Sequence, residues 1–214
     1  GTNGGVTTTV SGGSGVYTNY TWSNAASTQS ISNVAAGTYT ITVQDNTGCT
    51  NSNTFTLTDP AALAGSLSSK TDVACFGQST GAATVSATGG SGTYTVNWAT
   101  SGKTGLAVTG LSAGSYTATI SQAGCPQTVQ VPVTIAQPAT ALSVTSAVTG
   151  ATCTVGGTAT VTPAGGTSPY TILWSDGNTN LNRTNLSAGK HSYTVTDGGS
   201  CSYADSVTIS SSSS

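Results

Sequence analysis

The chain has 214 residues, of which only 5% are charged, and its formal net charge is −2. Globular proteins average about 25% charged residues, so Thr, Ser, Asn and Gly must supply most of the solubility here. Four Lys and Arg residues give no basic cluster of the kind that binds nucleic acid or an anionic membrane. No apolar run approaches the roughly 20 residues of a membrane-spanning helix.

Three tryptophans and three cysteines recur along the chain at one interval of 76 residues. Each tryptophan precedes its cysteine by 27 positions, and a Gly-Gly turn begins 9 or 10 positions before each tryptophan. Self-similarity at a fixed period indicates a tandem array of one small domain. The recurring residues are Trp22, Trp98 and Trp174 with Cys49, Cys125 and Cys201.

We expect three domains, at residues 1–60, 61–138 and 139–214, joined by short junctions that contain Pro60 and Pro138. In this register the first domain is truncated at its N-terminus, and the third has a Ser-rich end. The chain opens with Gly and contains no Met, and we interpret it as an internal piece of a longer, processed protein. A unit of about 75 residues buries only about 60% of its unfolded surface, so a covalent staple is expected.

The sequence predicts short β-strands throughout and shows no helical periodicity. In chain order, the clearest expected strands are 6–10, 38–43, 55–57, 83–87, 115–120, 131–135, 158–162, 191–196 and 207–209. Pro132 lacks a backbone donor, so its strand should lie at a sheet edge or carry a bulge. Short strands joined by Gly- and Asn-rich turns predict an all-β fold, a tandem array of three immunoglobulin-like β-sandwich domains.

The five cysteines predict one disulfide per domain. We expect the pairs Cys75–Cys125 and Cys153–Cys201, because the two cysteines of a repeat can lie on facing sheets at bonding distance. In this register Cys49 would bond to a residue upstream of Gly1. One bridge per small domain is typical of an oxidising, extracellular setting. Buried free thiols in a reducing compartment are the alternative, and zinc is disfavoured because there is no CxxC motif and a single His.

The recurring tryptophans are expected in the domain cores. We interpret Trp22, Trp98 and Trp174 as core anchors that pack against the disulfide, as in immunoglobulin-like sandwiches. Stacking on carbohydrate is the alternative role for these rings. Tyr39 and Tyr116, just after a Gly, stand where a tyrosine-corner contact would form.

Five segments of the first unit together carry a resemblance to a known family. They are GGSG at 12–15, YTWSN at 20–24, TQSI at 28–31, AGTYT at 36–40 and VQDNTGC at 43–49. This pattern resembles the SprB-type repeat, which occurs in many copies in very large cell-surface gliding adhesins of the Bacteroidetes. The resemblance covers all three units, and it departs from the pattern at 99–102, at 121–124 and at His191, which takes the place of a Tyr.

The resemblance implies an extracellular protein at the cell surface, exported by the type IX system, carried by the gliding machinery and used in attachment. We therefore expect structural and adhesive stalk repeats of a very long surface filament. The implied partners are neighbouring repeats of the same chain, the surface-anchoring or gliding machinery, and surface polysaccharide. The alternatives are a glycan-binding surface module, a subunit of a multi-chain extracellular fibril, and ice or mineral binding by outward Thr side chains.

Residues for catalysis are scarce. His191 is the sole histidine, and Glu is absent, so acid–base pairs and Ser-His-Asp arrangements cannot be assembled. We expect no enzyme, no cofactor and no metal site. The oxygens of Asp45-Asn46 and of 176–178 could bind Ca²⁺, but Asx turns explain them as well and are the preferred interpretation.

A covalent sugar is a further expectation, because so little charge covers the surface. The triplet Asp205-Ser206-Val207 resembles the Bacteroidetes O-glycosylation pattern, which makes Ser206 the candidate acceptor. Chance occurrence in a chain rich in Ser and Thr is the alternative. Asn19, Asn182 and Asn185 lie in N-x-Ser/Thr triplets, which matter only where an N-linking enzyme exists.

Overall fold

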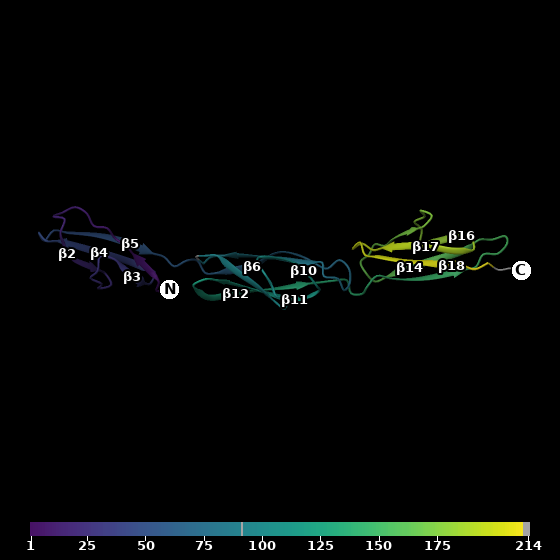
Figure 1. Ribbon diagram of the computed structural model, residues 1–214, viewed down its shortest axis with the longest axis horizontal. Helices are drawn as coiled ribbons and strands as arrows, with labels where there is room; N and C mark the ends of the chain where they lie inside the picture. Colours follow the sequence, from purple (N-terminus) through teal and green to yellow (C-terminus); the bar gives the residue numbers. More distant parts are fainter. Residues whose placement is uncertain (91, 212–214) are drawn as a thin grey trace. The chain divides into compact units, whose positions relative to one another are not determined.

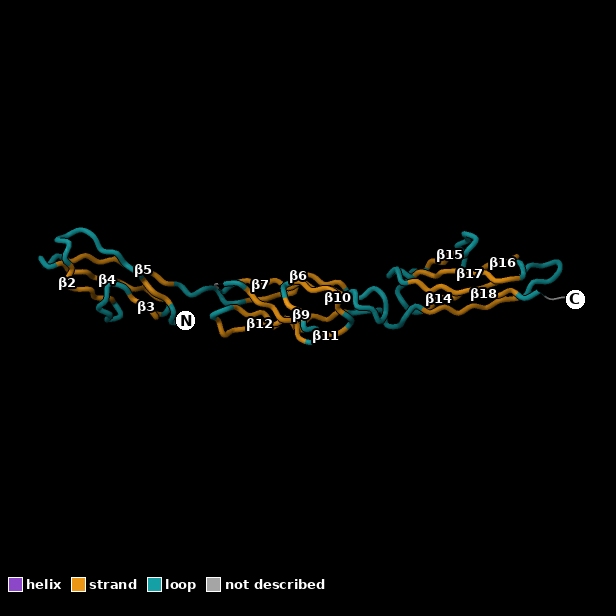
Figure 2. The backbone as a smooth tube through the Cα atoms, in the orientation of Figure 1, coloured by secondary structure: helices purple, strands orange, loops and turns teal. Residues whose placement is uncertain are grey.

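The computed structural model describes residues 1–90 and 92–211. In that part of the chain the regular secondary structure is entirely β, with eighteen strands and no helix (Figure 1, Figure 2). The chain divides into two compact units, one built on residues 1–62 and the other on residues 63–88 and from residue 92 onward. The expected Ser-rich end falls partly on residues 212–214, which lie outside the described residues.

The described residues form three separate hydrophobic cores, one in the first unit and two in the second. They fall within the three predicted domains, 1–60, 61–138 and 139–214, hereafter repeats one, two and three. The boundaries themselves remain a prediction, which the three cores support.

Repeat two is built from two antiparallel sheets. One sheet has the order β10-β7-β6 and the other the order β12-β11-β8-β9. The sheets enclose one core, so the expected immunoglobulin-like sandwich is confirmed. The strands are β6 (Ala64–Thr71), β7 (Gly81–Thr88), β8 (Tyr94–Ala99), β9 (Lys103–Thr104), β10 (Ala107–Leu111), β11 (Gly114–Gln122) and β12 (Cys125–Ile135).

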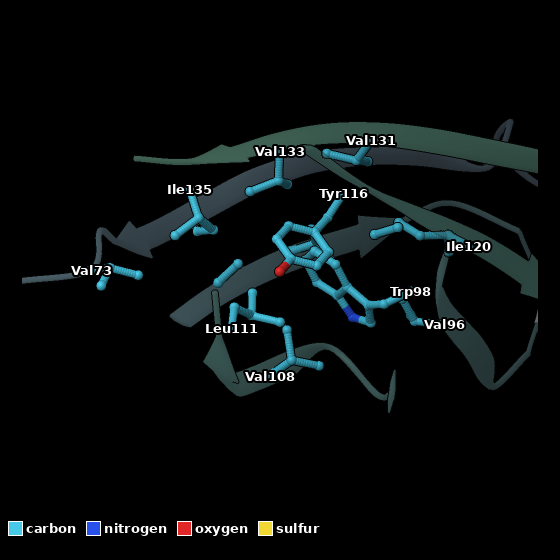
Figure 3. Close-up of a cluster of buried hydrophobic side chains, with 13 residues drawn as sticks. Val73, Val96, Trp98, Val108, Leu111, Tyr116, Ile120, Val131, Val133 and Ile135 are labelled. Atoms are coloured by element: carbon cyan, nitrogen blue, oxygen red, sulfur yellow. The ribbon is translucent and has the colours of Figure 1, made fainter. Parts of the chain in front are cut away.

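Alternation of inward and outward side chains makes these segments strands. In β11, Tyr116, Ala118 and Ile120 are buried and their neighbours are more exposed, which is the period of two of a strand with one face in the core. Trp98 is 2% exposed within the same cluster (Figure 3). Its indole N–H donates to the carbonyl oxygen of Gly105 at 2.9 Å. Burial of each large aliphatic side chain contributes about 1.5–3 kcal/mol.

The strand that contains Pro132 lies where its missing donor predicts. Strand β12 is at the edge of the sheet β12-β11-β8-β9. It pairs only with β11, so Pro132 interrupts no second ladder of hydrogen bonds.

Repeat three has the same plan, with sheets β13-β14-β16 and β15-β17-β18. Trp174 is 2% exposed, lies 4.9 Å from the ring of Tyr193 between centroids, and has the Arg183 guanidinium 5.1 Å from its ring centroid. Arg183 also donates to both carboxylate oxygens of Asp176, at 3.1 and 2.6 Å. The strands are β13 (Ser143–Thr149), β14 (Gly157–Ala164), β15 (Thr171–Trp174), β16 (Asn182–Leu186), β17 (Gly189–Thr196) and β18 (Ser202–Ile209).

Repeat one has the sheets β1-β3 and β2-β4-β5, and its residues 1–60 contain no counterpart of β6 or β13. The strand predicted at 6–10 ends at Val6. In the other repeats the corresponding strand pairs with β6 or β13 over all but its first residue, and residues 7–10 here have no such partner. The strands are β1 (Gly4–Val6), β2 (Tyr17–Trp22), β3 (Ile31–Val34), β4 (Gly37–Asp45) and β5 (Thr50–Leu57).

The expected tyrosine corners are present in the structure. The hydroxyl groups of Tyr39 and Tyr116 each donate to the carbonyl oxygen four residues upstream, at 2.9 Å. In repeat three, His191 takes this position, and its Nε2 lies 3.0 Å from the carbonyl oxygen of Ser187. The sole histidine therefore occupies a corner position of the framework.

Candidate functional sites: the joint between repeats and an open groove

A single disulfide joins repeat two to repeat three. It links Cys75, in the loop between β6 and β7, to Cys201, in the hairpin between β17 and β18. The two Cα atoms lie 5.7 Å apart, although 126 positions separate the residues in the sequence. Cys49, Cys125 and Cys153 are free thiols.

The predicted pairs Cys75–Cys125 and Cys153–Cys201 are therefore wrong, because the two cysteines of one repeat lie at opposite ends of it. In repeat two, Cys125 opens β12, whereas the loop of Cys75 lies where β12 ends: Val73 N–H donates to the carbonyl oxygen of Ala136 at 2.8 Å. The intervening strand has 11 residues, which span roughly 33 Å at 3.2–3.4 Å per residue. No bridge can cross that distance.

We call the end of a repeat that holds the hairpin cysteine its proximal end, and the end that holds the loop cysteine its distal end. The chain leaves a repeat at the distal end, because the last strand runs from the hairpin to that end. The disulfide thus connects the distal end of repeat two to the proximal end of repeat three. Accordingly, the tryptophans do not pack against a disulfide: Trp22 lies 6.1 Å from the ring of Phe55, and Trp174 contacts Tyr193.

The linker and the loop are held together on the repeat-two side of the joint. Ala136 N–H donates to Asp72 Oδ1 at 2.9 Å, and Gly77 N–H donates to Gln137 Oε1 at 2.8 Å. The hairpin of repeat three comes directly against this loop, because a Cβ atom on Gly199 would lie 2.8 Å from the carbonyl oxygen of Ala74. A side chain at residue 199 would therefore require the hairpin or the loop of Cys75 to shift.

A buried carboxylate shapes the hairpin that presents Cys201. Asp197 is 5% exposed; its Oδ1 accepts the N–H groups of Gly199 and Cys201 at 2.9 and 2.8 Å, and its Oδ2 accepts that of Thr167 at 2.9 Å. Burial by itself would raise the pKa of Asp197, but these three N–H donors outweigh it and lower the pKa.

Repeat one contains the same hairpin. Asp45 Oδ1 accepts the hydroxyl and N–H of Thr47 at 2.7 and 3.0 Å and the N–H of Cys49 at 3.0 Å, and its Oδ2 accepts the N–H of Ser14 at 3.1 Å. These bonds, chiefly that from the Thr47 hydroxyl, lower the pKa of Asp45 to about 2. Cys49 is therefore held in the same way as Cys201, by a hydrogen bond from its N–H to the aspartate four residues before it. In repeat two, Gln122 takes the place of the aspartate.

Sequence reasoning assigned Asp45 only to a turn, and it gave no role to Asp197 or Gly199. The signal that could have found the hairpin is an Asp four residues before a Cys in both repeats one and three.

An open groove of about 520 Å³ runs along repeat one. One side is the segment 7–13, and the floor is formed by β4 and β5, with Ile41, Val43 and Phe55 among its apolar residues. The groove lies within the first unit.

In repeat two, a strand fills the corresponding space. A Cβ atom on Gly65 of β6 would lie within 3.3 Å of Val129 and Val131 and would also meet Ile120. Counted along the paired strands, the positions equivalent to Ile120, Val129 and Val131 are 43, 51 and 53 in repeat one. All three positions line the groove. The groove therefore occupies, in repeat one, the space that strand β6 fills in repeat two.

The remaining candidate residues lie in ordinary strands and turns. Ser206 is half-buried in β18 opposite Ser192, and its glycosylation remains a prediction. Asp176 Oδ1 accepts the N–H of Asn178 at 3.1 Å, which is the Asx turn that sequence favoured. Among the described residues, no group of three or more His, Cys, Asp or Glu is placed to hold a metal ion. Within the same residues, no helix is long and apolar enough to cross a membrane.

A family model described as SprB repeat matches residues 67–103 and 145–179. The chain carries SprB-type repeats. The two matches cover corresponding parts of repeats two and three, and each includes the loop cysteine and the core tryptophan. Cys75 and Trp98 lie in the first match, and Cys153 and Trp174 in the second.

Among solved structures, the chain is similar to the N-terminal eight Ig domains of Down Syndrome Cell Adhesion Molecule (DSCAM) isoform 1.30.30, with 12% identity and a TM-score of 0.39 over 91% of this chain and 32% of that chain. It is also similar to domains 1–6 of the surface layer protein SbsC, with 15% identity and a TM-score of 0.28 over 92% of this chain and 35% of that chain. The chain thus spans about a third of the length of these two solved chains. No curated protein sequence matches it.

Proposed function

We propose that these SprB-type repeats form part of the stalk of a long extracellular surface protein, with a structural and adhesive role. The observation that carries the proposal is the disulfide between consecutive repeats, Cys75–Cys201. Disulfides persist in oxidising settings outside the cell, and a bond across a joint restricts bending between domains rather than stabilising one core. A stalk that must hold its direction requires such a restriction.

Two further features support a non-enzymatic role. The repeat family and the immunoglobulin-like sandwiches favour a structural protein. The sole histidine is used in a framework contact with Ser187. Partners are accordingly other repeats and surface structures, whereas export by the type IX system, anchorage to the gliding machinery and contact with surface polysaccharide are the narrower part of the proposal and rest on the resemblance of the repeat.

The burial of the three tryptophans argues against the glycan-binding alternative. Stacking on a sugar requires an exposed aromatic face, and Trp22, Trp98 and Trp174 are each 2% exposed. The multi-chain fibril alternative differs from the stalk in the number of chains in a cross-section.

The test is labelling of intact, non-permeabilised cells of the source organism with antibodies raised against this chain, combined with mild protease treatment. We expect labelled threads that project from the surface, removal of the label by protease, and weaker attachment of cells in which the gene is deleted. Label that requires permeabilisation would contradict the proposal. Threads containing several chains side by side would favour the fibril.

A further inference from the structure

The disulfide at the joint between repeats two and three is built from two parts that recur elsewhere in the chain. The first part is the distal loop. Cys75 lies two residues after Val73, whose N–H donates to the residue that follows the last strand of its repeat. Cys153 lies two residues after Ala151, whose N–H donates at 2.8 Å to Ser210, which likewise follows the last strand, β18. Cys153 is exposed.

The second part is the proximal hairpin, in which an aspartate accepts the N–H of the cysteine. It presents the bonded Cys201, and repeat one has the same arrangement around Cys49, which is also exposed. The free Cys153 and Cys49 thus have the same surroundings as the two halves of the existing bond.

From these two correspondences we infer that Cys153 is a crosslinking site for the hairpin cysteine of another SprB-type repeat, and that Cys49 is the site for a distal-loop cysteine. The bond Cys75–Cys201 is then one member of a series that joins each repeat to the next. The inference deepens the proposed function and rests on it for the oxidising location.

The bond forms by oxidation of two thiols. Each thiol loses its proton, one new S–S bond forms, and two electrons reduce the disulfide of a thiol oxidoreductase to a dithiol. The partner thiol comes from one of two sources with the same chemistry, either a following repeat of the same protein or the hairpin of repeat one in a second copy.

Successive bonds in this series overlap along the sequence. Cys153 lies between Cys75 and Cys201, so the next bond would begin inside the span of the first. A joint bridged in this way is connected twice, by the linker and by a disulfide, as the joint between repeats two and three is.

The test uses the whole chain carrying Cys125→Ser, so that Cys49 is the free hairpin cysteine, oxidised in a glutathione buffer at rising protein concentration. We expect linear multimers on non-reducing gels and a Cys153–Cys49 peptide in the digest, beside Cys75–Cys201. Adding Cys153→Ser or Cys49→Ser should abolish the multimers and leave Cys75–Cys201 intact. Dominant Cys153–Cys153 or Cys49–Cys49 dimers, or a Cys153–Cys201 bond within repeat three, would overturn the inference.

Peptide mapping of the protein taken from cells then distinguishes the two sources. A bond from Cys153 to a hairpin peptide of different sequence identifies a following repeat, and a bond to the Cys49 peptide identifies a second copy. Cys153 recovered as a free thiol from protein that labels on the cell surface would refute the crosslink and leave the proposed function standing. Protein found only inside cells would refute the proposed function, whereas multimers of the purified chain would still support the pairing.

Discussion

Cys75 and Cys201 are 126 positions apart in sequence and bonded, so the covalent path along the chain has a shortcut. Tension applied at the two ends passes from residue 75 through the sulfur atoms to residue 201. The strands between them, β7 to β17, lie outside that path. The bond therefore determines how far the chain can lengthen under load.

We predict that single-molecule stretching of the oxidised chain by its ends releases no length from the segment behind this bond. The hidden segment corresponds to roughly 420–450 Å of extended chain, from its 126-position separation and 3.3–3.6 Å per residue. Reduction, or the variant Cys201→Ser, should release this length as repeats two and three unfold. Cys153→Ser is the matched control and should behave as the wild type. Full release from the oxidised chain would show that the bond is absent.

The hairpin aspartates give the protein a specific acid sensitivity. The pKa of Asp45 falls from 3.8 to about 2 on folding. A lowered folded-state pKa stabilises the fold above the unfolded value, and this stabilisation is lost as the pH falls from about 4 through 2. The pKa of Asp197 is lowered too, so both hairpins should weaken in acid.

The variant Asp45→Asn should therefore have a lower melting temperature than the wild type at pH 7, and the difference should shrink as the pH falls toward 2. Calorimetry between pH 2 and 7 measures this. Asp59→Asn removes the same charge from a side chain that is 63% exposed and lies 3.3 Å from the N-terminal amine. Because such a surface ion pair contributes little to stability, this variant controls for net charge. A difference that stays constant across the range would show that the Asp45 carboxylate is not the stabilising group.

The sequence contained enough to predict most of this fold. The constant Trp-to-Cys interval predicted the repeats, and the alternation of apolar and polar residues predicted β11. The missing backbone donor of Pro132 predicted an edge strand. The pairing of the cysteines failed because it depends on which end of the domain each one occupies. Each antiparallel strand carries the chain to the opposite end, and the loop of Cys75 and the hairpin of Cys125 lie at the two ends of β12. Following the direction of the last strand would have excluded the bond. The contact between Gly199 and Ala74 depends on two repeats meeting, which local patterns do not encode.

The tyrosine corner permits a comparison of one position in two repeats. Tyr116→Phe removes the hydroxyl that donates to the carbonyl oxygen of Ser112 at 2.9 Å and should cost about 1 kcal/mol of unfolding free energy. His191→Tyr in repeat three restores the residue of the sister repeats and should keep stability or raise it. Urea unfolding of the two variants measures both effects. A Tyr116→Phe variant as stable as the wild type would show that the hydroxyl bond contributes nothing net.

The groove in repeat one should accept a β-strand of the type that begins repeats two and three. In those repeats the first strand places apolar side chains over the core. In repeat three, Leu142, just before β13, and Val144 of β13 pack against the core. A synthetic peptide of residues 140–150 should therefore bind the chain and raise the melting temperature of repeat one, because it covers Ile41, Val43 and Phe55. The same peptide with Asp at the positions of Leu142 and Val144 should not bind, since a carboxylate would then be buried without a partner.

Variants of the chain itself supply a second control. Val43→Asp should abolish binding of the peptide, whereas Val16→Asp, at a residue that is 55% exposed and does not line the groove, should leave binding intact. Calorimetric titration distinguishes these cases. Equal binding of the two peptides would mean that the groove does not recognise the apolar face of the strand.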